Sequence, residues 1–172
     1  MKTLYFTFCL ISTISFSQTK FDEKQILKQE VQNYQHDVDM DTILVNKMIL
    51  PYEKDFITDF KFQAERTGMS KNEIENIFGK DGEKLFKACS AKYWKRKSFE
   101  GLKVIVHDEK NNKRNVRNKL SYEFGISKLL IREDKKFAII QTQSSQMGGI
   151  LNVYKYSDDG WVFYKSITIS YS

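Results

Sequence analysis

The C-terminal stretch, residues 120–172, constrains the fold more than any other part of the chain. Three of its four apolar segments place large apolar side chains at alternate positions, and a pleated strand needs this period of two to bury one face. Short polar connections separate the segments, and the last two contain glycine, which favours hairpin turns. We therefore predict an antiparallel β-meander. The residues expected to share one face of each alternating strand are Leu120, Tyr122, Phe124 and Ile126, then Phe137 and Ile139, and last Trp161, Phe163, Ile167, Ile169 and Tyr171.

The beginning of the chain has the spacing of an amphipathic helix. Leu27, Val31, Tyr34 and Val38 recur at spacings of four, three and four, which places them on one narrow stripe. Acidic residues open the segment, and negative charge is favourable at the positive end of a helix dipole. We predict a helix from about residue 21 to 36.

A second helix is predicted in the middle of the chain. Ser70 and Glu73 form a capping box, in which serine is the N-cap and glutamate follows three residues later. Apolar residues then keep one helical phase, so we expect a helix from 71 to about 94, with a break near Gly79 as an alternative. Together with the meander, this predicts an α+β fold. Its sheet has about five or six strands and packs on the N-terminal helix and the central capped helix.

Three further segments are predicted to be strands. Residues 42–50 are apolar enough for a short one, and residues 102–107 alternate. Residues 56–64 also alternate, although the four-residue spacing from Phe56 to the next phenylalanine fits a helix as well. Residues 108–118 are highly polar and contain asparagine pairs, so we interpret them as a long hairpin connection into the meander.

The first 17 residues have the pattern of a secretory signal peptide. Lys2 supplies a positive start, residues 4–14 are mostly apolar but too short to span a bilayer, and small residues precede the expected cleavage between Ser17 and Gln18. The alternative is a buried first strand. We expect export to the periplasm or the extracellular space, and no later stretch is long enough for a transmembrane helix.

The rest of the chain, residues 18–172, is predicted to be a single α+β domain. Signal cleavage would remove Cys9 and leave Cys89 alone, so we expect no internal disulfide. Cys89 lies on an apolar helical face and is interpreted as a small buried hydrophobic residue, since no local motif pairs it with a histidine.

Motifs for catalysis, metal binding or cofactors are not evident in the sequence. Asp37, Asp39 and Asp41 alternate as carboxylates do at the start of a calcium-binding EF-hand loop. The pattern then departs from that motif, because Thr42 replaces the turn glycine and Met48 the bidentate glutamate. We therefore predict no metal, no cofactor and no catalytic residue, and interpret these aspartates as a solvated loop. A carboxylate pair assembled by the fold remains open.

Two basic clusters, the first around Trp94 and the second between residues 113 and 117, are the main candidates for a binding surface. The chain has 28 lysines and arginines against 22 acidic residues, a formal net charge of +6, and an exported basic protein suits an anionic cell-envelope partner better than nucleic acid. Trp94 or Tyr93 can then stack on a sugar or an aromatic group. The alternative is a solvated helix end and a charged loop. The predicted ligand-binding residues are Lys92, Trp94, Lys95, Arg96, Lys113, Arg114 and Arg117.

Residues 141–146 are six uncharged polar residues in succession, directly after the apolar start of the same predicted strand. One interpretation is a strand that emerges into solvent. The other is a hydrogen-bonding platform for a ligand.

A set of short motifs in residues 127–161 and at the end of the signal resembles a known group of proteins. The motifs are Ser127-Lys128, Phe137-Ala138-Ile139-Ile140, Gly148-Gly149, Val153-Tyr154-Lys155, Asp159-Gly160-Trp161 and Ser15-Phe16-Ser17-Gln18. They resemble the closing sheet and the signal of small uncharacterised exported α+β proteins from Bacteroidetes. Many of those sheets have a cysteine-glycine turn, which here is Gln146-Met147-Gly148-Gly149 without cysteine. The resemblance implies export and a sheet, and no catalytic residue.

Three functional hypotheses follow. The first is a periplasmic or secreted binding protein that meets an anionic partner through the basic clusters. The second is an inhibitor or immunity-type protein that blocks a partner enzyme with an exposed loop. The third is a small hydrolase, which requires a cleft with two carboxylates, one of them with a raised pKa.

Overall fold

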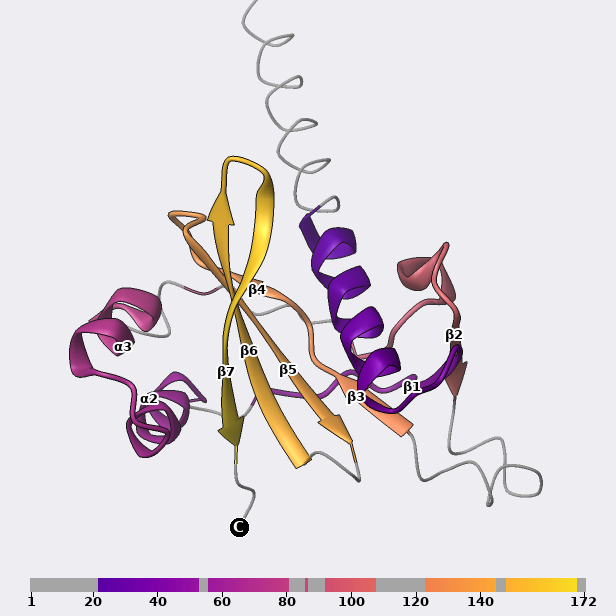
Figure 1. The fold of residues 1–172 in the computed structure, drawn as a ribbon, viewed down its shortest axis with the longest axis horizontal. Helices are drawn as coiled ribbons and strands as arrows, with labels where there is room; N and C mark the ends of the chain where they lie inside the picture. The colour runs from indigo at the N-terminus through magenta and orange to yellow at the C-terminus, as the bar shows by residue number, and fades with distance from the viewer. Residues whose placement is uncertain are drawn as a thin grey trace, which may run out of the picture.

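The computed structural model describes residues 22–52, 56–80, 86, 92–107, 123–144 and 148–169. Figure 1 shows that these residues form a twisted sheet with helices on both sides. The helices are the N-terminal helix (residues 22–37), α2 (Phe56–Arg66), α3 (Lys71–Phe78) and the 3₁₀-helix η2 (Arg96–Phe99). The strands are β1 (Ile43–Asn46), β2 (Val104–His107), β3 (Glu123–Ile126), β4 (Leu130–Ile131), β5 (Phe137–Ser144), β6 (Gly148–Ser157) and β7 (Gly160–Ile169).

The α+β prediction is confirmed, whereas the prediction of a purely antiparallel meander is only partly right. β3, β5, β6 and β7 pair antiparallel, with β4 beside β5, as the alternating segments indicated. The order across the sheet is β2-β1-β3-β5-β6-β7, and β1 is parallel to both of its neighbours. The sheet is therefore mixed.

The prediction of a hairpin between residues 102–107 and the meander is wrong. β2 and β3 lie on opposite sides of β1 and run in the same direction, so they are not paired as a hairpin. Parallel strands cannot be joined by a tight turn. The polar character of residues 108–118 gave no information on this direction, and those residues lie outside the described part of the chain.

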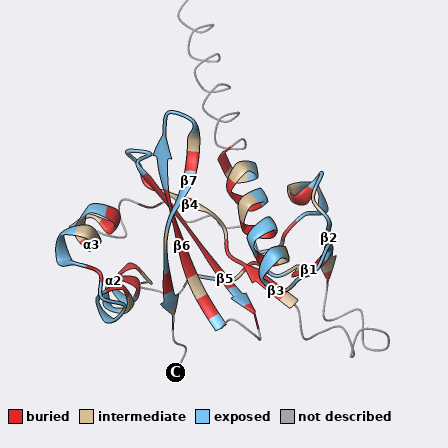
Figure 2. Ribbon diagram, in the orientation of Figure 1, coloured by how far each residue is buried: buried red, intermediate tan, exposed pale blue. Residues whose placement is uncertain are grey.

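The sheet is covered on both faces, and each face has its own core (Figure 2). The N-terminal helix, indigo in Figure 1, buries Leu27, Val31 and Tyr34 against one face, as its stripe predicted. α2 and α3 bury a second apolar cluster against the other face. β5 serves both, since Ala138 and Ile140 belong to the first core and Phe137 and Ile139 to the second. Alternation along one strand thus separates the two cores.

Residues 56–64 form a helix, which corrects the prediction of a strand. Ile57, Phe60 and Ala64 are the buried positions of α2, at spacings of three and four. Tyr52, Phe56 and Phe60 also stack on one another, with ring centroids 4.9 and 5.6 Å apart along the series. The alternation in this segment therefore arises by chance within a helical stripe, and burial against β7 selects the helix.

The central helix begins where the capping box predicted and ends much earlier than residue 94. The Ser70 side chain accepts a hydrogen bond from the Glu73 N–H, and α3 then runs only to Phe78. Gly79 terminates it with a positive φ of 70°, which glycine adopts without strain. Residues 92–95 lie against β1, with Tyr93 bridging to Met48. The prediction of one helix from 71 to about 94 is wrong, and the alternative of a break near Gly79 is supported.

A β-bulge in β7 overturns the prediction that its apolar residues share one face. Phe163 pairs with Tyr154 and Lys165 with Val153, so Tyr164 is an extra residue. The register shift places Trp161 in the core below the N-terminal helix and Ile167 in the core below α2 and α3.

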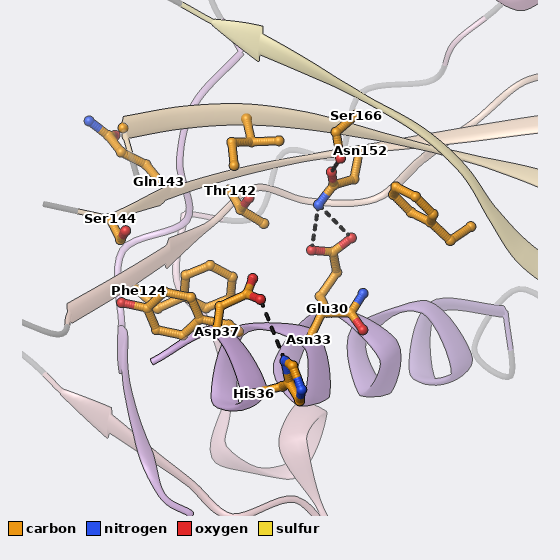
Figure 3. A pocket seen from close by; sticks show the side chains of 14 residues that line it. Glu30, Asn33, His36, Asp37, Phe124, Thr142, Gln143, Ser144, Asn152 and Ser166 are labelled. Atoms are coloured by element: carbon orange, nitrogen blue, oxygen red, sulfur yellow. Dashed lines mark hydrogen bonds and ion pairs between the residues drawn. The ribbon is translucent and has the colours of Figure 1, made fainter. Parts of the chain in front are cut away.

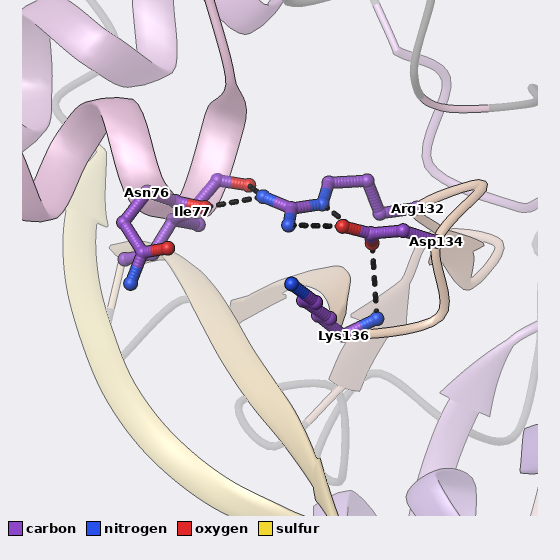
Figure 4. A network of polar contacts seen from close by, with 5 residues as sticks. All are labelled: Asn76, Ile77, Arg132, Asp134 and Lys136. Carbon is purple, nitrogen blue, oxygen red and sulfur yellow. Dashed lines mark hydrogen bonds and ion pairs between the residues drawn. The ribbon is translucent and has the colours of Figure 1, made fainter.

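An arginine joins the turn after β4 to the end of α3 (Figure 4). Arg132 is 7% exposed and donates to both carboxylate oxygens of Asp134, at 2.7 and 2.5 Å, and to the carbonyls of Asn76 and Ile77. The last turn of α3 has no basic residue of its own, so Arg132 supplies the cation that stabilises the negative helix end. Hydrogen bonding to this guanidinium lowers the pKa of Asp134 to about 2.

Some sequence predictions fall on residues that the structure does not describe. These are the signal peptide (1–17), Cys9, Cys89 and the basic residues Lys113, Arg114 and Arg117. Among the described residues, no helix combines the length and the apolar character that crossing a bilayer requires.

Candidate functional site

A pocket of about 250 Å³ lies between the C-terminal half of the N-terminal helix and the sheet (Figure 3). The helix contributes Glu30 and the residues one and two turns further on, and β3, β5, β6 and β7 form the opposite wall. Polar groups predominate near the helix and at the end of β5, while rings and an isoleucine line the remainder. The described lining residues are Glu30, Asn33, Tyr34, His36, Asp37, Phe124, Thr142, Gln143, Ser144, Gly148, Ile150, Asn152, Phe163 and Ser166.

Glu30 is the central polar residue of this pocket. It is 2% exposed, and its carboxylate accepts three hydrogen bonds from β6. The Asn152 amide donates to Oε1 at 3.0 Å and to Oε2 at 2.8 Å, and the Tyr154 hydroxyl donates to Oε1 at 2.6 Å. The Ser166 hydroxyl donates to Asn152 Oδ1 at 2.6 Å, which fixes the orientation of that amide. Ser166 thus orients Asn152, and Asn152 and Tyr154 together hold the Glu30 carboxylate in one position.

Burial of Glu30 changes its acid–base behaviour. Desolvation raises its pKa to about 7, although the hydrogen bonds from Tyr154 and Asn152 act in the opposite direction. The Glu30 charge in turn raises the pKa of the Tyr154 hydroxyl, which desolvation has already raised, so this hydroxyl stays a donor. Near neutral pH, Glu30 therefore exchanges between its protonated and ionised forms, as groups at functional sites often do.

The rim of the pocket carries a second carboxylate. Asp37 lies seven residues after Glu30, two turns along the same helix, and in Figure 3 its carboxylate points toward the sheet as that of Glu30 does. The side chain of Asp37 is 48% exposed, with His36 Nδ1 at 3.8 Å from its Oδ1. The pocket therefore joins a buried carboxylate to a solvated one, as the hydrolase hypothesis required.

The polar end of β5 forms part of the pocket wall. Thr142 and Ser144 follow Ala138 and Ile140 on the face toward the N-terminal helix, and both are buried, at 5% and 7% exposed. Gln141 is also buried, whereas Gln143 is exposed. The strand does not simply emerge into solvent. The location supports the ligand-platform interpretation for the described residues 141–144.

Sequence reasoning missed Glu30, although a signal was present. Glu30 lies three residues after Leu27 and four before Tyr34, so it belongs to the same buried stripe. A carboxylate on an apolar stripe must find a polar partner inside the fold. Asn152, within the apolar segment 150–156, is the matching signal on the sheet.

The first basic cluster is exposed, but it does not surround a helix end. Residues 92–95 run beside β1, where Trp94 N–H donates to the Lys47 carbonyl at 2.8 Å and Ile49 N–H to the Lys92 carbonyl at 3.1 Å. Lys92, Lys95 and Arg96 are all exposed. Their role in binding stays a prediction, and their distance from Lys113, Arg114 and Arg117 lies outside the described residues.

Trp94 itself is a core residue, which corrects its assignment to ligand binding. It is 2% exposed, its ring packs against Phe99 at 5.3 Å, and its Nε1 donates to the Ile126 carbonyl at 2.9 Å. Lys128 Nζ covers the ring at 4.1 Å while bound to Glu23. The ring is therefore not accessible for stacking. The exposed neighbour Tyr93 keeps that possibility, with Lys47 Nζ 5.6 Å from its ring centre.

The acidic loop after the N-terminal helix does not assemble a metal site. No group of three or more histidine, cysteine, aspartate or glutamate side chains with metal-binding geometry occurs among the described residues, which include Asp37, Asp39 and Asp41. Asp41 pairs with Lys103 at 3.7 Å.

Comparisons with protein-family models, with curated proteins and with solved structures found no match to this chain. The functional argument therefore depends on the geometry of the pocket and on the residues that line it.

Proposed function

We propose that this chain is an exported binding protein that holds a small polar ligand in the pocket between the N-terminal helix and the sheet. The observation that carries the proposal is the buried carboxylate of Glu30, fixed by Asn152 and Tyr154 beside a cavity. Ligand sites commonly combine apolar walls with a few precisely placed polar groups, and drug-sized ligands occupy roughly 300–1,000 Å³. A cavity of about 250 Å³ suits a smaller molecule.

Binding is favoured over hydrolysis by the hydrogen bonds of Glu30. A general acid must donate its proton to the substrate, whereas both oxygens of Glu30 accept hydrogen bonds from β6. These bonds favour the ionised, accepting form. Conversion of a bound molecule by Glu30 and Asp37 would instead identify the third hypothesis, so the experiment below also monitors chemical change.

The export part of the proposal depends on the sequence alone. Its support is the positive and then apolar pattern of residues 1–17, with small residues before Gln18. N-terminal sequencing of the protein recovered from the cell envelope or the medium tests it. A mature terminus at Gln18 is expected, and an intact Met1 would contradict it.

Ligand-observed NMR with a library of small polar fragments tests the pocket. We expect several fragments to bind the wild-type protein and to lose binding in Thr142→Phe, because a ring at Thr142 fills the cavity. Thr168→Phe is the matched control, since Thr168 is an exposed threonine of β7 outside the pocket lining. Fragments that bind Thr142→Phe as well as they bind the wild type would overturn the proposal.

A second candidate is binding of an anionic partner by the segment around Tyr93. The specific observation is that Lys47, directly after β1, joins Lys92, Lys95 and Arg96 beside this exposed ring. An aromatic ring among cations suits an anionic sugar polymer, which offers both charge and stacking.

Elution from immobilised heparin with a salt gradient tests this candidate. We expect Arg96→Glu to elute at a clearly lower salt concentration than the wild type. Lys155→Glu, an equal charge change at an exposed site on β6, is the control and should shift elution less. Equal shifts in the two variants would mean that only net charge matters.

A further inference from the structure

The charges that line the pocket differ from those of the chain as a whole. The chain has a formal net charge of +6, yet none of the described residues that line the pocket is lysine or arginine. Its ionisable lining groups are Glu30, Asp37, His36 and the hydroxyl of Tyr34, with Tyr154 bonded to Glu30 from β6. The site is therefore an acidic cavity in a basic protein.

The helix adds to this negative potential. The pocket lies at the C-terminal half of the helix over residues 22–37, and the C-terminal end of a helix dipole is negative. A carboxylate is disfavoured there, and a cation is favoured. Asp37, the last residue of the helix, therefore lies where a positive partner improves the electrostatics, and Glu30, two turns earlier, adds a second negative group to the same pocket.

Glu30 also has an acceptor position to offer. A carboxylate has about four lone-pair positions, and Asn152 and Tyr154 fill two on Oε1 and one on Oε2. No other donor among the described residues reaches Oε2. A buried charged group with an open acceptor, at the edge of a cavity, is suited to one N–H donor of a ligand.

The apolar walls suit the carbon part of such a ligand. The rings of Tyr34 and Phe124 stack with centroids 4.1 Å apart and an interplanar angle of 9°. Phe163 stands edge-on to Tyr154 at 5.9 Å, and Ile150 lines the pocket further along β6. Aromatic faces attract organic cations through the negative charge of the ring face.

We infer that the ligand is a small organic cation, an amine whose charged nitrogen is held by Glu30, with Asp37 adding negative charge at the rim, and whose carbon skeleton packs on Phe163. This inference rests on the proposed function, because it names the ligand class of the same pocket. A neutral sugar would bring no positive charge to the two carboxylates or to the helix end. An anion would meet two negative groups.

The acid–base behaviour of Glu30 adds a signature to the test. A cation binds the ionised form, and with a pKa of about 7 only a minority of Glu30 is ionised at pH 6. Apparent affinity falls in proportion to the competent fraction, so binding should be about tenfold weaker at pH 6 than at pH 8. Binding near pH 7 should also release protons to the buffer.

Isothermal titration calorimetry with matched probes tests the inference. Isopentylamine and choline are the charged probes, and isopentanol and 3,3-dimethylbutanol are their neutral counterparts of similar shape. We expect the amines to bind, the alcohols not to bind, and Glu30→Gln to lose amine binding while keeping its circular dichroism and melting temperature. Glu23→Gln, on the same helix but bonded to Lys128 outside the pocket, should bind like the wild type.

Asp37→Asn provides a second variant in case Glu30→Gln fails to fold, because Asp37 is solvated on the rim. It should weaken amine binding several-fold. Alcohols that bind as tightly as the amines would overturn the cation inference and leave the pocket proposal standing. If neither set of probes binds, both proposals fail. If Nα-acetyl-lysine methylamide binds more tightly than isopentylamine, the ligand is the lysine side chain of a peptide and not a free small amine.

Discussion

The two faces of the sheet are built from alternate residues of the same strands, yet one face covers a filled apolar core and the other borders a partly polar cavity. The face toward α2 and α3 is filled by aliphatic and aromatic side chains that are almost fully buried, among them Ile139, Leu151 and Ile167. The face toward the N-terminal helix begins in the same way at Ala138 and Ile140. It then becomes polar at Thr142 and its neighbours and leaves a cavity.

Each face also carries a buried charged residue that can be compared, and the two are treated differently. Arg132, beside α3, donates to a carboxylate and to two helix carbonyls, so it serves structure. Glu30, on the N-terminal helix, keeps an acceptor position toward the cavity. A satisfied charge is typical of an anchor, whereas an incompletely satisfied one in a cavity is typical of a site.

Neighbouring residues on β6 give the sharpest test of the difference between the faces. Leu151 is fully buried on the face toward α2 and α3, and its replacement by alanine leaves a cavity there. We expect Leu151→Ala to lower the free energy of unfolding by about 3–5 kcal/mol, measured by urea denaturation.

Ile150→Ala is the matched control, because Ile150 is the preceding residue and lines the existing pocket. It should cost only about 1 kcal/mol, since the side chain is partly exposed and already borders a cavity. Equal losses in the two variants would show that both faces are packed alike.

Arg132 tests whether the charge on the helical face is structural. Arg132→Met should lower the free energy of unfolding by about 2–3 kcal/mol, because it removes the guanidinium that donates to two helix carbonyls and to both carboxylate oxygens of Asp134. Arg132→Lys should recover only part of this loss, since a compact ammonium cannot reproduce the planar fork. Lys136→Met, an exposed cation in the same turn, should have little effect. A comparable loss in that control would argue against the anchor.

The contribution of Glu30 is the smallest expected effect on the free energy of unfolding. Its pH dependence is opposite to that of an ordinary carboxylate. Because its pKa is raised to about 7 in the folded protein, its contribution to stability is fully present below the unfolded pKa of 4.5 and is lost as pH rises through about 7. The free energy of unfolding should fall by about 2 kcal/mol between pH 5 and pH 8 in the wild type, relative to Glu30→Gln. Parallel pH profiles for the two proteins would contradict the raised pKa.

Much of the fold could be predicted from the sequence where the local pattern was unambiguous. The stripe of Leu27, Val31 and Tyr34 predicted a helix, and the short apolar run 137–140 between polar segments predicted a strand, and both predictions are confirmed. Residues 56–64 fit both periods, and only contact with β7 decides for the helix. The bulge at Tyr164 and the parallel pairing of β1 depend on contacts between distant segments, which periodicity does not report.

The candidate site could be predicted only in part, for a similar reason. The polar end of β5 was visible as an unusual run, because such residues at the end of a strand are uncommon. Glu30 and Asn152 were each a single polar residue in an apolar pattern, and the sequence did not reveal that they face each other. Clusters of cations drew attention to Trp94, although tryptophan beside lysines is as often buried as exposed.

The hydrogen bonds of Glu30 have a consequence for how the protein folds during synthesis. Its partners Asn152 and Tyr154 lie 122 and 124 positions later in the chain, and Gln29 of the same helix bonds to the Trp161 carbonyl 132 positions away. The N-terminal helix therefore leaves the ribosome early, and the part of its docking surface that includes Asn152, Tyr154 and Trp161 is not available until the last hairpin is made. Contacts of such long range slow folding. Completion of the pocket is thus a late event, and a chain that binds ligand has already assembled its final strands.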